Sequence, residues 1–92
     1  MHVVLVYDIV MDEEGAGIYR RVFKHCKQYL SHIQNSVFEG NLSPAKLKEL
    51  EIKVKKHLRN DKDSVIVFHV RTEKWLDKEF WGTKEDATSV FL

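Results

Sequence analysis

The feature that most constrains the fold is the run of ten residues at the start of the chain, MHVVLVYDIV. Five of the six residues before Tyr7 are apolar and three of them are β-branched, so the run does not alternate with a period of two. Such a run is typical of a central strand that is covered on both faces. It predicts a strand at the centre of a sheet, and this strand ends at one carboxylate, Asp8.

Asp8 raises the question of how its charge is satisfied. Aspartate disfavours strands and is costly to bury, so we expect it at the open end, near a cation, water or a basic side chain. It could equally cap the loop that follows. Three further acids, at positions 12–14, occupy that loop. They could supplement Asp8 around a cation, or favour the positive end of a following helix, which is the alternative we prefer.

Two later stretches have helical periodicity. Their apolar residues recur every three or four positions: Ile18, Val22, Cys26 and Leu30 in the first, and Leu47, Leu50, Val54 and Leu58 in the second. The first pattern predicts a helix from Ile18. Ser43 and Pro44 suit the N-cap and the first position of the second helix.

Extended segments separate and follow the helices. Residues 31–40 predict one strand, or two short strands with a bend, and residues 64–70 predict another. This order favours the ferredoxin-like βαββαβ fold, whose second central strand must then lie within residues 31–42. The tail, residues 75–92, carries two tryptophans and two phenylalanines, which we expect to pack on a partner or a sheet edge.

Size and composition limit the class of protein. The 92 residues predict a single domain, 1–92, with one modest core that oligomerisation could extend. No apolar run reaches the roughly 18 residues of a membrane span, so we expect a cytoplasmic protein without a membrane partner. The one cysteine, Cys26, fits a reducing compartment and a role in core packing.

The net charge of +1 hides a segregation along the chain. Residues 16–62 contain eleven Lys/Arg and four Asp/Glu, whereas the two ends are acidic. A basic segment of this kind can bind a polyanion, although two solvated helix faces would have the same composition. Arg20 and Arg21 are expected near the end of the first strand, where they suit phosphate contacts unless they are merely solvated.

Three segments in order resemble a known family. They are Tyr7-Asp8-Ile9, then Arg20-Arg21 with Lys24, then His32-Ile33-Gln34-Asn35-Ser36-Val37-Phe38-Glu39-Gly40; Asp63-Ser64-Val65 before an apolar strand adds a fourth. Together they resemble the small CRISPR-associated protein of spacer acquisition, the partner of the CRISPR integrase. The chain departs from that pattern at His32, where an arginine is usual, which would make a phosphate contact there depend on pH.

The resemblance implies a dimeric ferredoxin-like fold with an additional C-terminal strand. That strand, at about residues 83–92, would cross to the partner's sheet, which agrees with the apolar end Val90-Phe91-Leu92. It also implies two candidate functions. The first is a Mg²⁺-dependent endonuclease or endoribonuclease, and the second is a non-catalytic scaffold that bridges DNA between integrase dimers.

For the enzyme, the resemblance implies that Asp8 is both the metal ligand and the catalytic residue, with Mg²⁺ shared between the Asp8 of two protomers. The nucleic acid, duplex DNA or single-stranded RNA, would contact Tyr7, Arg20, Arg21, Lys24, His32 and Phe38. Tyr7 and Phe38 could instead be ordinary core residues. A small-ligand module is disfavoured, because Gly15 and Gly17 do not complete a dinucleotide-binding motif.

Overall fold

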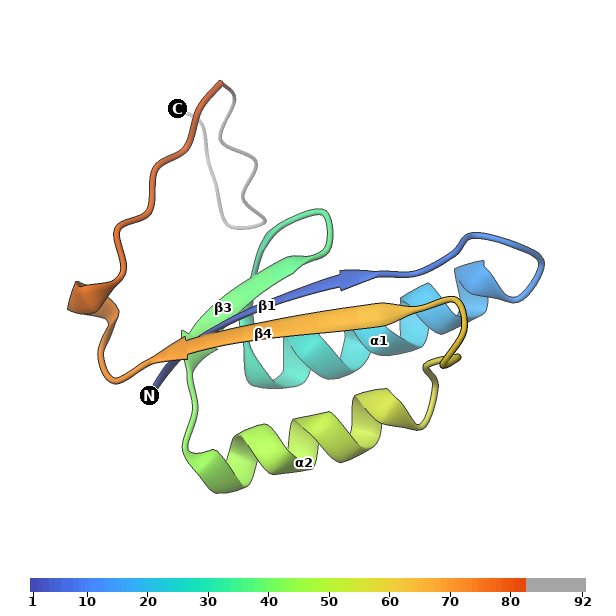
Figure 1. Ribbon diagram of the computed structural model, residues 1–92, viewed down its shortest axis with the longest axis horizontal. Coiled ribbons are helices and arrows are strands. Elements are labelled where there is room, and N and C mark those ends of the chain that lie inside the picture. Colours follow the sequence, from blue (N-terminus) through green and yellow to red (C-terminus); the bar gives the residue numbers. More distant parts are fainter. Residues whose placement is uncertain (83–92) are drawn as a thin grey trace.

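The computed structural model describes residues 1–82 and contains one antiparallel sheet with two helices on one of its faces (Figure 1). The elements in chain order are β1 (His2–Asp8), α1 (Gly15–Tyr29), β2 (Ser31–Gln34), β3 (Val37–Asn41), α2 (Pro44–Lys55) and β4 (Ser64–Val70). The strand order is β2-β3-β1-β4. This confirms the predicted ferredoxin-like βαββαβ fold and the central position of β1 between β3 and β4.

Residues 31–42 contain the two short strands that this fold requires. Asn35 adopts a left-handed conformation, with φ at 42°, in the turn between β2 and β3. Asparagine tolerates this region better than most residues, because its short side chain bonds locally. The pairing of β2 with β3 is irregular between His32 and Gln34, which explains why the sequence shows no clean alternation there.

The two faces of β1 are not buried equally, which differs from the prediction. Val3, Leu5 and Tyr7 point towards the helices and are at most 3% exposed. Val4 and Val6, on the opposite face, are only half-buried. The expectation that β1 is covered on both faces is therefore wrong in part, because the helices cover one face and a segment after β4 covers the other incompletely.

The core lies between the sheet and the helices. Its fully buried side chains include Phe38, Leu50, Val22 and Cys26. Burial raises the pKa of the Cys26 thiol to about 12, which agrees with a packing role rather than a reactive one. Ser43 caps α2 as predicted, since its Oγ accepts a hydrogen bond from the backbone N–H of Lys46 at 3.2 Å.

Helix α1 begins at Gly15, three residues earlier than predicted. The Asp12 carboxylate accepts hydrogen bonds from the backbone N–H groups of Glu14 (3.2 Å) and Gly15 (3.1 Å), which start the helix before the apolar stripe does. After β4, one short 3₁₀ helix (Glu73–Trp75) precedes residues 76–81, which line a pocket together with Val4 of β1 and Val37 of β3. The predicted exchange strand at 83–92 lies outside the described residues. Among residues 1–82, no helix is long and apolar enough to cross a bilayer.

Candidate functional site

Asp8 is the last residue of β1 and pairs with Ser64 of β4. It follows His2, Val4 and Val6 on the sheet face that points away from the helices, and its side chain is exposed. Within residues 1–82, its carboxylate has no hydrogen-bond or ion-pair partner. Asp8 is therefore not the cap of the following loop, and its charge is free to interact with a ligand.

A network centred on Arg59 fixes the loop that follows Asp8. The guanidinium donates to the Val10 carbonyl oxygen (Nη2, 2.7 Å) and to Asp12 Oδ1 (Nη1, 2.6 Å). It also bonds both carboxylate oxygens of Asp63, at 2.9 and 3.0 Å. Asp63 Oδ1 in turn accepts from the Val10 backbone N–H at 3.1 Å. The loop is thus tied to the connection between α2 and β4, and this holds the end of β1 in place.

The acids of this network are occupied by cations of the chain itself. Lys62 Nζ lies 2.9 Å from Asp12 Oδ2, and hydrogen bonds from Lys62 and Arg59 hold the pKa of the Asp12 carboxyl well below its usual range. Hydrogen bonds from Arg59 lower the pKa of Asp63, whose side chain is fully buried, to about 2. Asp12 starts the helix and binds Arg59, so the alternative that it supplements Asp8 around a cation is wrong.

Sequence reasoning missed the Arg59 network. In the sequence, Asp63 was noticed only as part of a family motif, and Arg59 was counted only among the basic residues of segment 16–62. The two are four residues apart, but Asp12 and Val10 lie 47 and 49 residues from Arg59, so no local pattern links them.

The basic middle of the chain separates into two surfaces with different electrostatics. On α2, Lys46, Lys48 and Lys55 each form an ion pair with Glu49 or Glu51, at 2.5 to 3.4 Å. On α1, Arg20, Arg21 and Lys24 are exposed, and none has an ion-pair partner within residues 1–82. The uncompensated positive charge therefore lies mainly on α1, which begins close to the end of β1 (Figure 1).

Two of the other predicted contact residues, Tyr7 and Phe38, are buried, and the third, His32, is half-buried. Tyr7 and Phe38 are 3% and 0% exposed and stack at 6.1 Å between ring centroids. Their burial supports the core-packing alternative and corrects the expectation that they contact a base. The His32 ring packs at 4.9 Å from both Phe23 and Phe38, and its Nε2 lies 2.8 Å from the Asn35 carbonyl oxygen. His32 thus stabilises the β2–β3 turn, and that nitrogen is already engaged.

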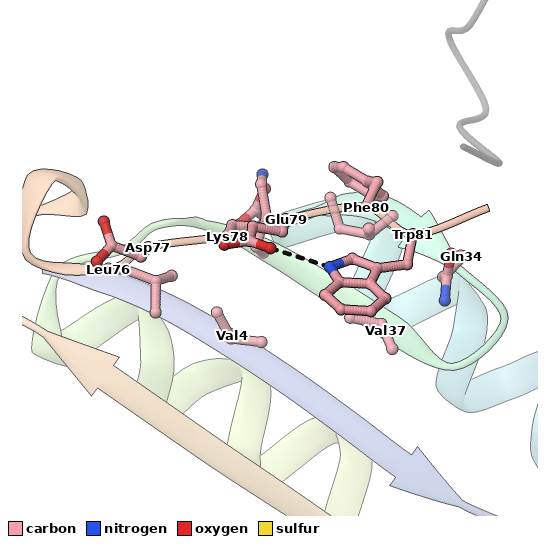
Figure 2. A pocket seen from close by; sticks show the side chains of 11 residues that line it. Val4, Gln34, Val37, Leu76, Asp77, Lys78, Glu79, Phe80 and Trp81 are labelled. Atoms are coloured by element: carbon pink, nitrogen blue, oxygen red, sulfur yellow. Dashed lines mark hydrogen bonds and ion pairs between the residues drawn. The ribbon is translucent and has the colours of Figure 1, made fainter. Parts of the chain in front are cut away.

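The face of the sheet opposite the helices is partly covered by the segment Leu76 to Trp81. Figure 2 shows Leu76 above Val4 and the Trp81 indole above Val37, with a shallow pocket between the segment and the strands. Lys78 holds the segment through an ion pair with Glu39, whose other oxygen lies 3.2 Å from His2 Nε2. The β4 half of the same face stays open, with Ile66 and Phe68 more than half exposed.

The two tryptophans of the tail are exposed in the part of the chain that the structure describes. Trp75 and Trp81 are 70% and 85% exposed, although the Trp81 Nε1–H donates to Glu79 at 2.9 Å. The part of the prediction that places them on a partner therefore stays a prediction.

No group of three or more histidine, cysteine, aspartate or glutamate side chains within residues 1–82 is arranged to hold a metal ion. A cation bound at Asp8 would find one carboxylate there, with its other ligands from solvent or substrate. This donor set suits Mg²⁺, which prefers oxygen and retains several waters.

Comparisons with known proteins agree with this geometry. The family model described as "CRISPR associated protein Cas2" matches residues 1–78. The "CRISPR-associated endoribonuclease Cas2" of Fusobacterium nucleatum is 51% identical over 92 residues, covering 100% of this chain and 87% of that protein. The protein of the same name from Methanosarcina acetivorans is 33% identical over the full length of both.

A solved structure described as "Crystal structure of cas2" has a TM-score of 0.80 and 37% identity, and the match covers 100% of this chain and 95% of the other. Streptococcus pyogenes Cas2, at 24% identity and a TM-score of 0.73, shares the fold over 87% of this chain and 100% of its own. These matches, with which the sheet order agrees, show that the chain belongs to the Cas2 family of CRISPR-associated proteins.

Proposed function

We propose that this chain acts in CRISPR spacer acquisition as a Mg²⁺-dependent endonuclease, with Asp8 as its metal-binding and catalytic residue. The observation that carries the proposal is the exposed Asp8 carboxylate, which has no partner within residues 1–82, although Asp12 and Asp63 nearby are both paired. The curated relatives carry the name endoribonuclease, which supports cleavage of phosphodiesters.

Bound Mg²⁺ would neutralise charge on the scissile phosphate and favour attack by water. Asp8 would hold the ion, and the Arg59 network would keep the end of β1 rigid, so that the carboxylate is positioned before substrate arrives. Arg20 and Arg21 would bind neighbouring phosphates and hold the strand over the site.

A homodimer completes this site. Ile66 and Phe68 are exposed on the same face as Asp8, and exposed apolar side chains on one face are typical of an interface. A two-fold dimer formed through this face would place both Asp8 carboxylates at the shared interface. The CRISPR integrase and nucleic acid, either duplex DNA or single-stranded RNA, would be the further partners.

The function is tested with purified protein and labelled RNA and DNA, with Mg²⁺ and with EDTA. We expect Mg²⁺-dependent internal cleavage of at least one substrate that EDTA abolishes. The absence of cleavage of either substrate above the EDTA background would contradict the proposal.

One observation favours the alternative of a non-catalytic scaffold. Within residues 1–82, Asp8 belongs to no group of three or more histidine, cysteine, aspartate or glutamate side chains that could hold a metal ion, whereas α1 presents unpaired cations that suit a duplex backbone. The same assay separates the two functions, since a scaffold binds duplex DNA without cleaving it.

The division of charge between the helices predicts how salt affects binding. Replacing Arg20 and Arg21 by Gln should reduce the slope of log affinity against log salt by roughly two, because each lost phosphate contact removes about one unit. Replacing Lys53 and Lys55 by Gln is the matched control on α2, where Lys55 is paired with Glu51 and Lys53 lies over Tyr29. Fluorescence anisotropy on a short duplex measures both slopes. A larger loss in the α2 variant would move the binding surface to that helix.

The exposed apolar residues on the open face of the sheet predict how substitutions there affect dimerisation. Phe68→Asp should shift the protein to monomer, because it places a charge in an apolar contact, while the monomer stays folded since this side chain is 58% exposed. Ile52→Asp, at an exposed apolar position on α2, is the control and should leave the dimer intact. Removing residues 83–92 should also weaken the dimer if they cross to the partner. Light scattering that shows an unchanged dimer for Phe68→Asp would exclude this face.

A further inference from the structure

A pair of histidines joins α1 to the segment that follows α2. His25 of α1 and His57, just after α2, have their Nε2 atoms 3.3 Å apart, and their rings are nearly parallel at 5.3 Å between centroids. At this distance one Nε2 carries the proton and the other accepts it, so the contact needs at least one neutral ring. The Nδ1 atom of His25 is buried and has no hydrogen-bond partner.

The groups around this pair are cations. Burial, together with the charges of His25, Arg21 and Lys56, lowers the pKa of His57 below its usual value of 6.5. Arg21 comes from α1 and Lys56 from the end of α2, and both are exposed without an ion-pair partner within residues 1–82. The pair therefore gains a proton only against two positive neighbours, Arg21 and Lys56, unless an anion is present.

We propose that this seam, formed by His25, His57, Arg21 and Lys56, is a proton-linked binding site for a phosphate group. When both histidines are protonated they can no longer bond each other, and both Nε2–H groups become donors beside two permanent cations. An oxyanion placed there would satisfy both donors and relieve the repulsion. A phosphate group fits these donors and positive charges, whether it belongs to a nucleic-acid backbone or is free in solution.

The sign of the pH dependence follows from linkage. Without an anion, the lowered pKa means that the unfolded chain binds protons more readily, so the seam loses stability as the pH falls below about 6.5. With an anion, protonation is coupled to binding, so affinity rises over the same range. The seam does not involve Asp8, although it shares Arg21 with the proposed phosphate contacts of α1, so the Asp8→Asn variant is used to separate it from the metal-dependent chemistry.

The first test measures binding of a short DNA duplex by anisotropy at constant ionic strength, at about pH 8 and about pH 5.5, on either side of the histidine range. Phosphodiesters stay ionised across this range, so any change comes from the protein. We expect the parent affinity to rise about tenfold, the factor that corresponds to one pKa unit. His25→Gln and His57→Gln should lose most of this gain. His69→Gln, at an exposed histidine on β4, is the matched control and should retain it.

The second test follows the histidine signals by NMR with and without sulfate, which stays a dianion over this range. Sulfate should raise the pKa values of His25 and His57 and leave that of His69 unchanged. If sulfate does so without a proton-linked gain for the duplex, the site binds a free oxyanion.

Unchanged pKa values together with a pH-independent duplex affinity would overturn the proposal, as would a full gain in the two seam variants. Asp8→Asn separates this proposal from the nuclease assignment, since it should retain the proton-linked gain.

Discussion

Asp8→Asn is expected to abolish Mg²⁺-dependent cleavage, with a loss of at least about 100-fold, the scale seen when a transition-state charge loses its stabilising group. The substitution keeps the size of the side chain and removes the charge that would hold the ion. Because both protomers contribute the same residue, one substitution removes both carboxylates from the site. The measurement is the initial rate of cleavage of labelled RNA or DNA over a range of Mg²⁺ concentrations.

The fold should tolerate this change. Asp8 is exposed and has no partner within residues 1–82, so its removal should alter the free energy of unfolding by less than about 0.5 kcal/mol. If two Asp8 carboxylates face each other across the dimer, the metal-free dimer should be no less stable, since a like-charge repulsion is lost.

Glu13→Gln is the matched control for this experiment. Glu13 is an exposed acid in the loop after β1, and within residues 1–82 it has no ion-pair partner. Its replacement should leave cleavage unchanged. Undiminished cleavage in Asp8→Asn would mean that another residue holds the metal, and an equal loss in Glu13→Gln would point to a general effect of acidic charge.

The fold was predictable from sequence because its main signals are local. The β-branched run before Tyr7, the apolar stripe of α1 and the Ser43-Pro44 helix start each determine a structure within a few residues. Where α1 begins was not predictable in this way, because the Asp12 carboxylate starts the helix before the stripe. For residues 31–40 the sequence left two alternatives open, one strand or two short strands with a bend, and the structure has the second, with the bend at Asn35.

The candidate site was predictable only in part. Asp8 was found because a carboxylate that ends an apolar strand is unusual. That the Asp8 carboxylate has no partner could not be predicted from the sequence, because it depends on Arg59 forming ion pairs with Asp12 and Asp63 instead. Tyr7 and Phe38 belong to a family motif, but a motif does not say which face of a strand a ring occupies. The parity of β1 places Tyr7 beside Leu5 in the core.

The Arg59 network gives the second large prediction, which concerns stability. Asp63→Ala should reduce the free energy of unfolding by about 2 kcal/mol, because Arg59 loses its buried carboxylate partner and keeps only the more exposed Asp12. The backbone N–H groups of Val10 and Arg59 also lose their acceptor, at 3.1 and 3.0 Å. Urea unfolding followed by circular dichroism measures the change. Asp61→Ala, an exposed acid in the same turn, is the control and should have little effect.

The pH dependence of stability identifies the cause of this loss. In the folded protein the pKa of Asp63 is about 2, below its usual value of 3.8, so the unfolded chain binds a proton more readily. Its contribution is therefore complete above about pH 4 and is lost as the pH falls through about 2. The difference in stability between the parent and Asp63→Ala should shrink over that range. A difference that stays constant there would mean that packing, rather than the charge of Asp63, stabilises the loop behind Asp8.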